Sequence, residues 1–210
     1  MSIFSEADFW ICIGLGYFIG STPIGLIAGK LKGIDIRQHG SGNIGATNVL
    51  RTLGKPIGIT VLVFDIIKGI LPVMFALGLT NNPVIHVAAA LATILGHNFT
   101  FWLKFKGGKG IATTAGSMLP LVPIALLVAV TLWIVGFLVT RYVSIGSIAA
   151  AVSIPIVQFI LTLIGVYELN WPVLIYCLAL AILAIWKHRS NIKRLMNGTE
   201  SRFNKKTKEA

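Results

Sequence analysis

Long hydrophobic runs dominate the sequence, and short polar stretches separate them. The runs are rich in Leu, Ile, Val, Phe and Ala and carry few charges, and most are long enough to cross a bilayer as helices. They comprise residues 9–29, 56–79, 84–103, 111–140, 143–166 and 173–186. A Gly-Ser-Thr-Pro break at residues 20–23 interrupts the first run, and a basic tail at 187–210 follows the last. This pattern predicts an all-α, polytopic membrane protein. Lys193, Arg194 and the other basic residues of the tail are expected to contact anionic lipid.

The run at residues 111–140 is too long for one span and contains Pro120 and Pro123. One straight helix of that length would measure about 45 Å, against about 30 Å for the apolar core of a bilayer. A hairpin turning at the two prolines gives about seven transmembrane segments in total. Its first half, residues 111–121, is short for a span and is expected to be partly buried among its neighbours.

The distribution of charge orients these segments. With seven segments, the Lys and Arg residues other than Lys68 fall on one side, and Glu6, Asp8 and Glu168 fall on the other. The positive-inside rule then predicts an N-terminus outside and a C-terminus in the cytoplasm. Because the N-terminal stretch carries no Lys or Arg before the first run, we expect a retained helix rather than a cleaved signal peptide.

The composition agrees with a membrane protein. The 210 residues are 55% hydrophobic and 12% charged, and the mean hydropathy is +0.84. In a soluble protein the net charge of +11 would suggest nucleic acid, but here the positive loops explain it, and no nucleic-acid partner is expected. Cys12 and Cys177 lie in apolar runs and are expected to be small buried residues rather than disulfide partners or metal ligands.

The first polar connection, residues 30–55, contains a glycine-dense strip. Residues 39–51 read His-Gly-Ser-Gly-Asn-Ile-Gly-Ala-Thr-Asn-Val-Leu-Arg. Glycines permit positive φ and close approach of a ligand, and successive amides in such turns form anion-binding nests. A helix beginning at about Ala46 would add its positive end. The alternative is a flexible loop that joins two hydrophobic segments.

Part of the strip, Gly-Ser-Gly-Asn-Ile-Gly, formally matches the dinucleotide fingerprint G-x-G-x-x-G. That motif requires a preceding strand and an acidic residue about 20 positions later. Asp65 stands at about that distance but lies inside an apolar run, so a dinucleotide site is disfavoured.

A second glycine-rich loop, Lys-Gly-Gly-Lys-Gly at residues 106–110, precedes the fourth hydrophobic run. Glycines and a lysine at a helix N-terminus suit phosphate, because backbone donors, the helix dipole and a point charge act together. The alternative is contact with anionic lipid heads, which fits Lys104 and Lys106. Lys109, between two glycines, fits ligand binding better.

Several polar residues stand inside or at the ends of the apolar runs. His97 and Asn98 could be polar contacts between helices or part of a site. Asp65 and Lys68 share a helix face and could be a structural pair or functional groups. His188 and Asn191 share a face at the end of the last run, whereas Arg189 points away.

With this topology, Arg51, Lys109 and His188 would meet at the cytoplasmic membrane face. We expect a substrate that carries one or two phosphates and an apolar tail. Carboxylates are sparse and no Cys/His cluster exists in the sequence, so neither a metal nor another cofactor is expected.

These motifs resemble those of the bacterial integral-membrane glycerol-3-phosphate acyltransferases that use acyl phosphate. The resemblance covers nearly the whole chain, as one domain over residues 1–203 followed by a basic polar tail at 204–210. The segments that carry it are Gly40-Ser-Gly-Asn-Ile-Gly-Ala-Thr-Asn-Val-Leu-Arg51, Gly96-His-Asn98, Phe105-Lys-Gly-Gly-Lys-Gly-Ile-Ala-Thr113, Arg141-Tyr-Val-Ser-Ile-Gly-Ser147 and His188-Arg-Ser-Asn191.

The resemblance implies acyl transfer from acyl phosphate to glycerol 3-phosphate, which gives lysophosphatidic acid and phosphate at the inner membrane. This is the first committed step of phospholipid synthesis. The residues to which it assigns catalytic roles are Ser41, Lys109, His188 and Asn191. The residues expected to bind substrate are Gly40, Gly42, Asn43, Gly45, Thr47, Asn48, Arg51, His97, Gly107, Gly108, Thr113 and Ser147. Membrane lipid and the enzyme that supplies acyl phosphate are the other expected partners.

The expected chemistry needs little from the protein beyond positioning and charge stabilisation, because acyl phosphate has an excellent leaving group. No histidine is followed by aspartate at the His-x-x-x-x-Asp spacing of soluble-type glycerolipid acyltransferases. The proton of the attacking hydroxyl goes to His188 or to a substrate phosphate oxygen, and no acyl-enzyme on Ser41 is expected. The rival hypotheses are a transporter of phosphorylated anions, which the acidic outer face suits poorly, and a lipid-binding scaffold, which leaves the glycines unexplained.

Overall fold

The hydrophobic runs fold into helices whose ends coincide with the polar breaks. The computed structural model of the chain describes residues 6–203, and its regular elements in that range are all helical. The beginning of the chain and the predicted tail at residues 204–210 lie outside the described residues. The elements are α1 (Glu6–Gly20), α2 (Ile24–Leu31), η1 (Ile36–Gln38), α3 (Ala46–Leu53), α4 (Lys55–Leu79), α5 (Pro83–Asn98), η2 (Phe101–Leu103), α6 (Ile111–Met118), α7 (Pro123–Thr140), α8 (Val143–Leu163), α9 (Trp171–Lys187) and α10 (Arg189–Met196).

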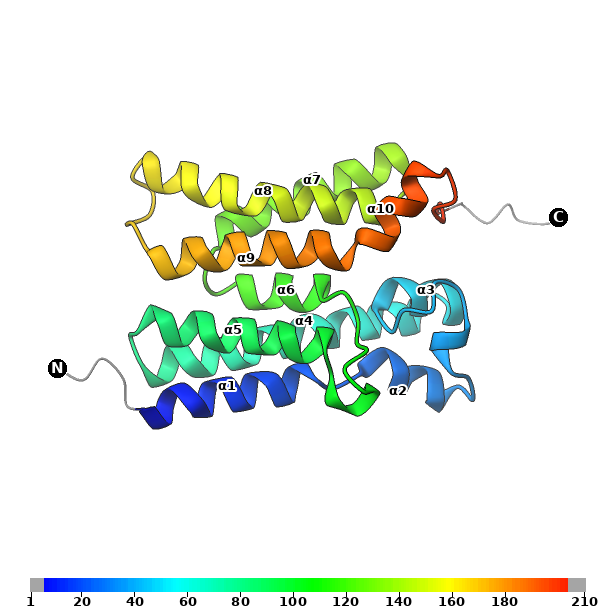
Figure 1. Cartoon of the computed structure of the whole chain (residues 1–210), viewed down its shortest axis with the longest axis horizontal. Coiled ribbons are helices and arrows are strands. Elements are labelled where there is room, and N and C mark those ends of the chain that lie inside the picture. The colour runs from blue at the N-terminus through cyan, green and yellow to red at the C-terminus, as the bar shows by residue number, and fades with distance from the viewer. Residues whose placement is uncertain (1–5, 204–210) are drawn as a thin grey trace. The chain divides into compact units, whose positions relative to one another are not determined.

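The chain divides into two units. Of the described residues, unit 1 comprises 6–123 and 170–176, and unit 2 comprises 124–169 and 177–203. In unit 1, α1, α4, α5 and α6 run side by side (Figure 1). Small residues allow this close packing: a Cβ on Gly20 of α1 would lie 2.0 Å from the carbonyl oxygen of Thr93 on α5. Similarly, a Cβ on Gly116 of α6 would lie 2.1 Å from the carbonyl oxygen of Ile66 on α4.

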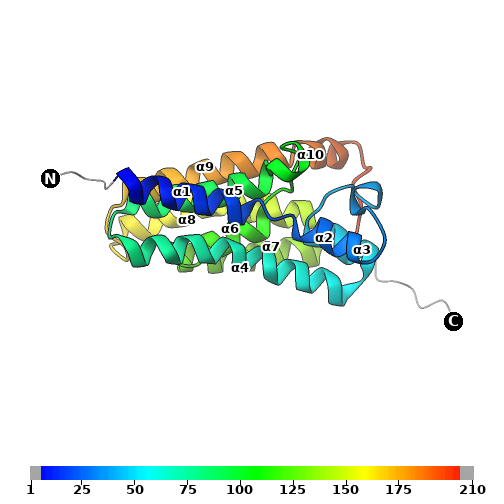
Figure 2. The same ribbon diagram turned by 90° about the horizontal axis from the view of Figure 1, so that it is seen from below.

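Two short helices of unit 1, α2 and α3, follow the break after α1. Figure 2 shows α2 and α3 beyond the end of α1. The loop at residues 32–45, which includes η1, connects α2 to α3. A small apolar core, formed by Leu26, Ile36, Ile44, Val49 and Val61, holds α2, η1 and α3 against the start of α4. This core positions the glycine strip relative to the helices.

Unit 2 contains α7, α8, most of α9, and α10. The helices α7 and α8 meet at two glycines, since a Cβ on Gly136 would lie 3.3 Å from the Cα of Gly146. The axes of α9 and α10 differ by 53° across a break at His188. The helix direction therefore changes at His188, one of the residues that the sequence analysis expects in the site.

Among residues 6–203, five helical segments are long and apolar enough to cross a membrane, and a sixth is reached if α9 and α10 count as one bent span. The break predicted at the two prolines is present, because α6 ends at Met118 and α7 begins at Pro123. The eight residues of α6 extend only about 12 Å, too little to cross the apolar core. As predicted, this short segment is partly buried, through Thr113, Gly116, Ser117 and Met118. Cys12 and Cys177 are buried free cysteines, as expected.

Candidate active site

The glycine strip forms a structured turn between η1 and α3. Gly40 and Gly42 adopt positive φ angles of 59° and 69°, which glycine tolerates without strain, whereas Gly45 has a φ of −77°. The helix α3 begins at Ala46, where the sequence predicts it. The first amides of α3 have no partner within the helix and add a partial positive charge.

The side chain of Asn48 holds this turn together from inside. Its Oδ1 accepts the Ser41 amide at 2.8 Å, and its Nδ2 donates to the carbonyls of Ile36 at 3.1 Å, His39 at 2.9 Å and Asn43 at 2.9 Å. Asn48 is 1% exposed, so its amide shapes the loop. We expected it as a substrate-binding group; the structure places it behind the loop surface.

Other amides of the strip are also used within the loop. The Gly42 amide donates to the His39 carbonyl at 3.0 Å, and the Gly45 amide donates to Asn43 Oδ1 at 2.8 Å. Ser41 is exposed, and Thr47 and Arg51 are half-buried on α3. Four residues apart, Thr47 and Arg51 share one face of this helix.

The Gly-Gly-Lys loop lies directly on the C-terminal end of α5. The Gly107 amide donates to the Asn98 carbonyl at 3.2 Å, and the Gly108 amide donates to the His97 carbonyl at 3.0 Å. A Cβ on Gly107 would lie 2.0 Å from the His97 carbonyl oxygen, and one on Gly108 would lie 2.1 Å from His97 Nε2. These two glycines therefore serve close packing of the loop on α5.

Lys109 follows at the start of α6. It is half-buried between the buried Gly108 and Gly110, and Gly110, with a φ of 79°, caps the helix that begins at Ile111. The predicted combination of a lysine and a helix N-terminus is present. Thr113, one turn into α6, is fully buried, and its Oγ1 lies 3.3 Å from His97 Nδ1.

The two glycine loops line one cavity within unit 1. It has a volume of about 570 Å³, and its lining residues are Arg37, Gly42, Ile44, Trp102, Leu103, Lys104, Lys106 and Gly107. One predicted site residue from each loop, Gly42 and Gly107, lines this cavity, whereas Arg51 and Lys109 are not in its lining. That Arg51, Lys109 and His188 meet stays a prediction. The cations of the lining were missed as site residues, because the sequence interpretation assigned Lys104 and Lys106 to lipid heads and gave Arg37 no role.

Arg37 is held at the cavity by Asp35. The Arg37 Nε donates to Asp35 Oδ1 at 2.9 Å, and its Nη2 donates to Oδ2. The side-chain and backbone hydrogen bonds from Arg37 lower the pKa of Asp35 to about 2. The pair stays ionised near neutral pH, so the guanidinium keeps a defined direction.

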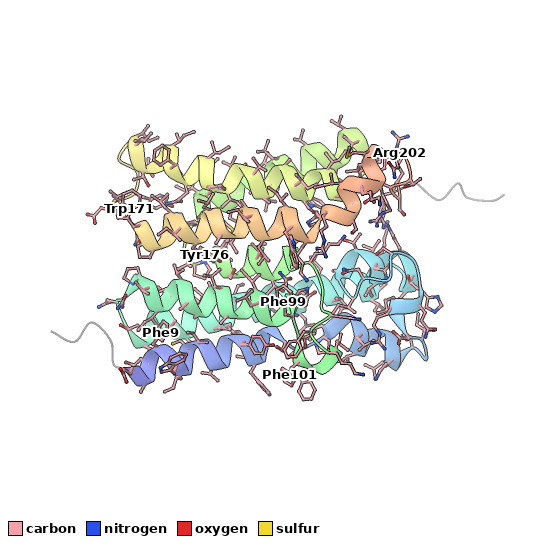
Figure 3. All side chains as sticks on the ribbon, viewed as in Figure 1. Phe9, Phe99, Phe101, Trp171, Tyr176 and Arg202 are labelled. Atoms are coloured by element: carbon pink, nitrogen blue, oxygen red, sulfur yellow. The ribbon has the colours of Figure 1, made fainter. Side chains whose placement is uncertain are left out.

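A second, apolar cavity adjoins the first through Trp102 and Leu103. Its volume is about 400 Å³, and its other lining residues are Phe18, Thr22, Pro23, Leu26, Ile27 and Lys30. The ring of Phe101, in the same η2 turn, lies 6.3 Å from that of Tyr17 and 6.2 Å from that of Phe18 at the end of α1 (Figure 3). Unit 1 therefore places an apolar groove beside a cationic one.

In unit 2, Ser147 is buried between α7 and α8. Its Oγ donates to the Val143 carbonyl at 2.9 Å and accepts from Trp133 Nε1 at 3.1 Å. Only 2% of the residue is exposed. These contacts fix the hydroxyl near the start of α8.

His188 lies at the break between α9 and α10 and is 3% exposed. Its Nδ1 lies 2.8 Å from the Ala184 carbonyl oxygen. Because a carbonyl can only accept, this bond assigns the proton to Nδ1 and leaves the lone pair on Nε2. As predicted, Asn191 is buried with His188, whereas Arg189 is exposed and lies over the Trp186 ring.

A glutamate missed by sequence reasoning organises this region. Glu200 Oε1 accepts from Asn191 Nδ2 at 2.6 Å and from Ser144 Oγ at 2.8 Å, and Oε2 accepts from Arg194 Nε at 2.7 Å. Burial opposes ionisation, but the bonds from Asn191, Ser144 and Arg194 outweigh it and lower the pKa of Glu200. An acid among basic residues was the available signal. The tail, Arg194 included, was interpreted as a lipid contact.

The segment after α10 is also tied to the α7–α8 turn. The Phe203 amide donates to the Arg141 carbonyl at 2.9 Å, and the Arg202 guanidinium lies 5.3 Å from the centroid of the Tyr142 ring (Figure 3). The Phe203 ring packs edge-on against Phe137. The loop at Arg141 and the helix carrying Asn191 therefore form one structured corner of unit 2.

Within residues 6–203, no group of three or more His, Cys, Asp or Glu side chains gathers in a way that could hold a metal. The chemically capable groups are instead cations, hydroxyls, amides and one histidine. The fold and the cavities define a helical membrane protein that presents cationic side chains beside an apolar groove.

Comparison with known proteins gives the family. The family model described as glycerol-3-phosphate acyltransferase matches residues 10–198. The curated glycerol-3-phosphate acyltransferase of Desulforamulus reducens is 50% identical over 197 residues, covering 93% of this chain and 95% of its own. That of Desulforudis audaxviator is 48% identical, covering 92% and 94%.

Solved structures agree. The crystal structure of PlsY (YgiH), an integral membrane glycerol 3-phosphate acyltransferase, in its glycerol 3-phosphate form has a TM-score of 0.87 and 36% identity over 93% of this chain and 96% of its own. Its lysophosphatidic acid form has a TM-score of 0.84, covering 93% and 95%. The chain belongs to the glycerol-3-phosphate acyltransferase family: it is an integral membrane acyltransferase of phospholipid synthesis.

Proposed function

We propose that the protein transfers a fatty acyl group from acyl phosphate to glycerol 3-phosphate, giving 1-acyl-glycerol 3-phosphate and orthophosphate. The observation that carries this proposal is the cavity of about 570 Å³ between the two glycine loops, with Arg37, Lys104 and Lys106 in its lining. A phosphate dianion suits such a cavity because charge-assisted hydrogen bonds are the strong ones. The adjoining apolar groove suits the lipid part of a substrate.

The acceptor and product follow from the relatives. The PlsY structures are of a glycerol 3-phosphate form and a lysophosphatidic acid form, and we assign the same acceptor and product to this chain. In the proposed site, Ser41 and the backbone of the strip from Gly40 to Gly45 bind phosphate. Arg51 and Lys109, which lie outside the lining of that cavity, are assigned by the family resemblance to clamp glycerol 3-phosphate. His97, Thr113 and Asn48 support these loops.

Acyl phosphate is the proposed donor because the motifs of the chain resemble those of the acyl-phosphate-dependent acyltransferases, and the chain has no His-x-x-x-x-Asp pair. In the reaction, the glycerol hydroxyl oxygen bonds to the acyl carbon, the bond from that carbon to the phosphate oxygen breaks, and orthophosphate leaves. A mixed anhydride needs orientation and charge stabilisation more than strong base catalysis. Ser147, His188 and Asn191 are the unit 2 residues to which we assign parts of this site.

We also propose that the chain crosses the bacterial inner membrane with seven segments, α6 being the short one, with its N-terminus outside. The charge distribution supports this orientation. Both glycine loops, the turn at Arg141 and α10 then face the cytoplasm, where glycerol 3-phosphate is available.

The test of the function uses purified protein in micelles or lipid mesophase, supplied with acyl phosphate and glycerol 3-phosphate. Orthophosphate and lysophosphatidic acid are expected to appear in equal amounts, above the hydrolysis seen without protein. Acyl-coenzyme A in place of acyl phosphate is expected to give no product. If folded protein that binds glycerol 3-phosphate yields no product, acyl transfer is wrong and uptake into liposomes becomes the assay.

The proton acceptor can be tested at His188. If Nε2 takes the hydroxyl proton, His188→Ala lowers kcat by at least about 100-fold, because general base catalysis contributes on the order of 10²–10⁴. The measurement is kcat at saturating substrates, with folding checked by thermal unfolding. An unchanged kcat would assign the proton to a substrate phosphate oxygen instead.

A further inference from the structure

Three buried ionisable side chains meet between α4 and α5, and none of them is in the lining of either cavity. Asp65 is 2% exposed, and Lys68 and His97 are each 5% exposed. Lys68 Nζ lies 2.6 Å from Asp65 Oδ1, and His97 Nδ1 lies 3.7 Å from the same oxygen. We call Asp65, Lys68 and His97 the buried triad.

Burying these charges is costly, so their placement needs a reason. A buried ion pair is often no more stabilising than apolar residues of the same size, because desolvation offsets the attraction. Ionisable groups inside a membrane segment are functional candidates for the same reason. The pair lies in the middle of α4, and the residues of this helix from Val61 to Leu79 are otherwise apolar.

The triad, carried by α4 and α5, contacts three further parts of unit 1: the break between α1 and α2, the helix α6 and the Gly-Gly-Lys loop. Lys68 Nζ donates to the Thr22 carbonyl at 3.0 Å, in the break between α1 and α2. The imidazole of His97 contacts Thr113 Oγ1 of α6 at 3.3 Å. Its opposite edge faces the Gly-Gly-Lys loop, since a Cβ on Gly108 would lie 2.1 Å from Nε2.

The charge on Asp65 selects the orientation of this ring. A carboxylate 3.7 Å from Nδ1 favours the tautomer with the proton on that nitrogen, as acidic partners of histidine do elsewhere. Lys68 Nζ, 2.6 Å from Asp65 Oδ1, holds the Asp65 side chain in place. The ring is then pinned on one edge by Asp65 and Thr113, and its other edge supports Gly108.

We propose that the buried triad is a positioning device that sets the height of the Gly107–Lys109 loop above α5. Lys109 thereby reaches the phosphate of glycerol 3-phosphate. His97 and the Asp65–Lys68 pair act through the loop and do not touch the substrate. The inference rests on the proposed function in one respect, that this loop binds the acceptor phosphate.

The first test removes the pair without leaving a lone buried charge. In the double variant Asp65→Leu/Lys68→Met, two apolar side chains of similar length replace the ion pair. We expect KM and the directly measured Kd for glycerol 3-phosphate to rise by at least about tenfold, since small misplacements of binding groups carry such costs. The kcat at saturating acceptor is expected to stay within about threefold.

The second test probes the contact between His97 and Gly108. Gly108→Ala is expected to raise KM for glycerol 3-phosphate by about tenfold, because the new methyl group meets a pinned ring. In a His97→Ala background the same methyl group is expected to add less than about twofold, since residues in contact are not additive. Equal costs in both backgrounds would overturn the proposal.

His86→Ala is the matched control. His86 lies on the same helix, is 8% exposed, and bonds through Nε2 to the Thr80 carbonyl at 2.6 Å, at the opposite end of α5. We expect it to leave KM and Kd unchanged. A folded Asp65→Leu/Lys68→Met protein with wild-type KM and Kd, or with a lower kcat alone, refutes the positioning role. Because Kd is measured without turnover, this result is separate from any failure of acyl transfer.

Discussion

Lys109→Met is expected to lower kcat/KM for glycerol 3-phosphate by about 100-fold. The lysine is half-buried between two buried glycines at the N-terminus of α6. In the variant, water therefore cannot readily solvate a phosphate that has lost its ammonium partner. Loss of a desolvated charge partner costs about 2–5 kcal/mol, and about 1.4 kcal/mol corresponds to tenfold. Initial rates of lysophosphatidic acid formation across a range of glycerol 3-phosphate concentrations measure the effect.

The control is Lys32→Met, which removes an exposed lysine of unit 1 and is expected to change kcat/KM less than twofold. Lys104→Met and Lys106→Met test the cavity lining. If those two variants lose activity while Lys109→Met keeps it, the acceptor phosphate lies among the cavity lysines and the assignment to Lys109 is wrong.

The order of elements could be predicted from the sequence because the signals are local. Hydrophobic runs, prolines and glycines fixed the start of α3 at Ala46, the turn before Pro83 and the break before Pro123. Each depends on residues within a few positions of the boundary. The polar character of both glycine loops was visible for the same reason.

The roles of individual residues were harder to predict, because these roles depend on partners that are distant in the sequence. Gly107 and Gly108 were expected to bind substrate through their backbone, yet a Cβ on either would meet His97 or Asn98 of α5. Asn48 was expected at the substrate, yet its amide bonds four groups of its own loop. A sequence shows that a residue is polar but not which way its side chain points.

Glu200 is a residue whose role the sequence did not predict, again because its partners are distant along the chain. Its partners Ser144 and Asn191 lie 56 and 9 positions away, so no local pattern joins them. The charge of the tail suggested lipid contacts, whereas the fold pairs Arg194 with Glu200 at 2.7 Å. The acid is therefore the centre of the α8–α10 corner.

Glu200→Gln is expected to lower the stability of the folded protein by about 2–4 kcal/mol, since hydrogen bonds to a charged group contribute about 1.5–3 kcal/mol each. The Gln amide group cannot accept from Asn191, Ser144 and Arg194 together. Asn191 then loses its support, so we also expect kcat to fall by at least about tenfold. Thermal unfolding followed by tryptophan fluorescence gives the first quantity, and the acyl transfer assay gives the second.

The pH dependence of the Glu200→Gln effect supplies the decisive check. Folding lowers the pKa of Glu200 from its ordinary value of 4.5, so ionised Glu200 stabilises the folded state above about pH 4.5 and that contribution is lost as the pH falls through the lower, folded value. The difference in unfolding temperature between wild type and Glu200→Gln should be constant near neutral pH and shrink below pH 4.5. Glu168→Gln, at an exposed position of the same unit, should show no such difference at any pH. A gap between wild type and Glu200→Gln that persists undiminished in acid would mean that the carboxylate charge does not hold the corner together, and that the shape of the side chain does.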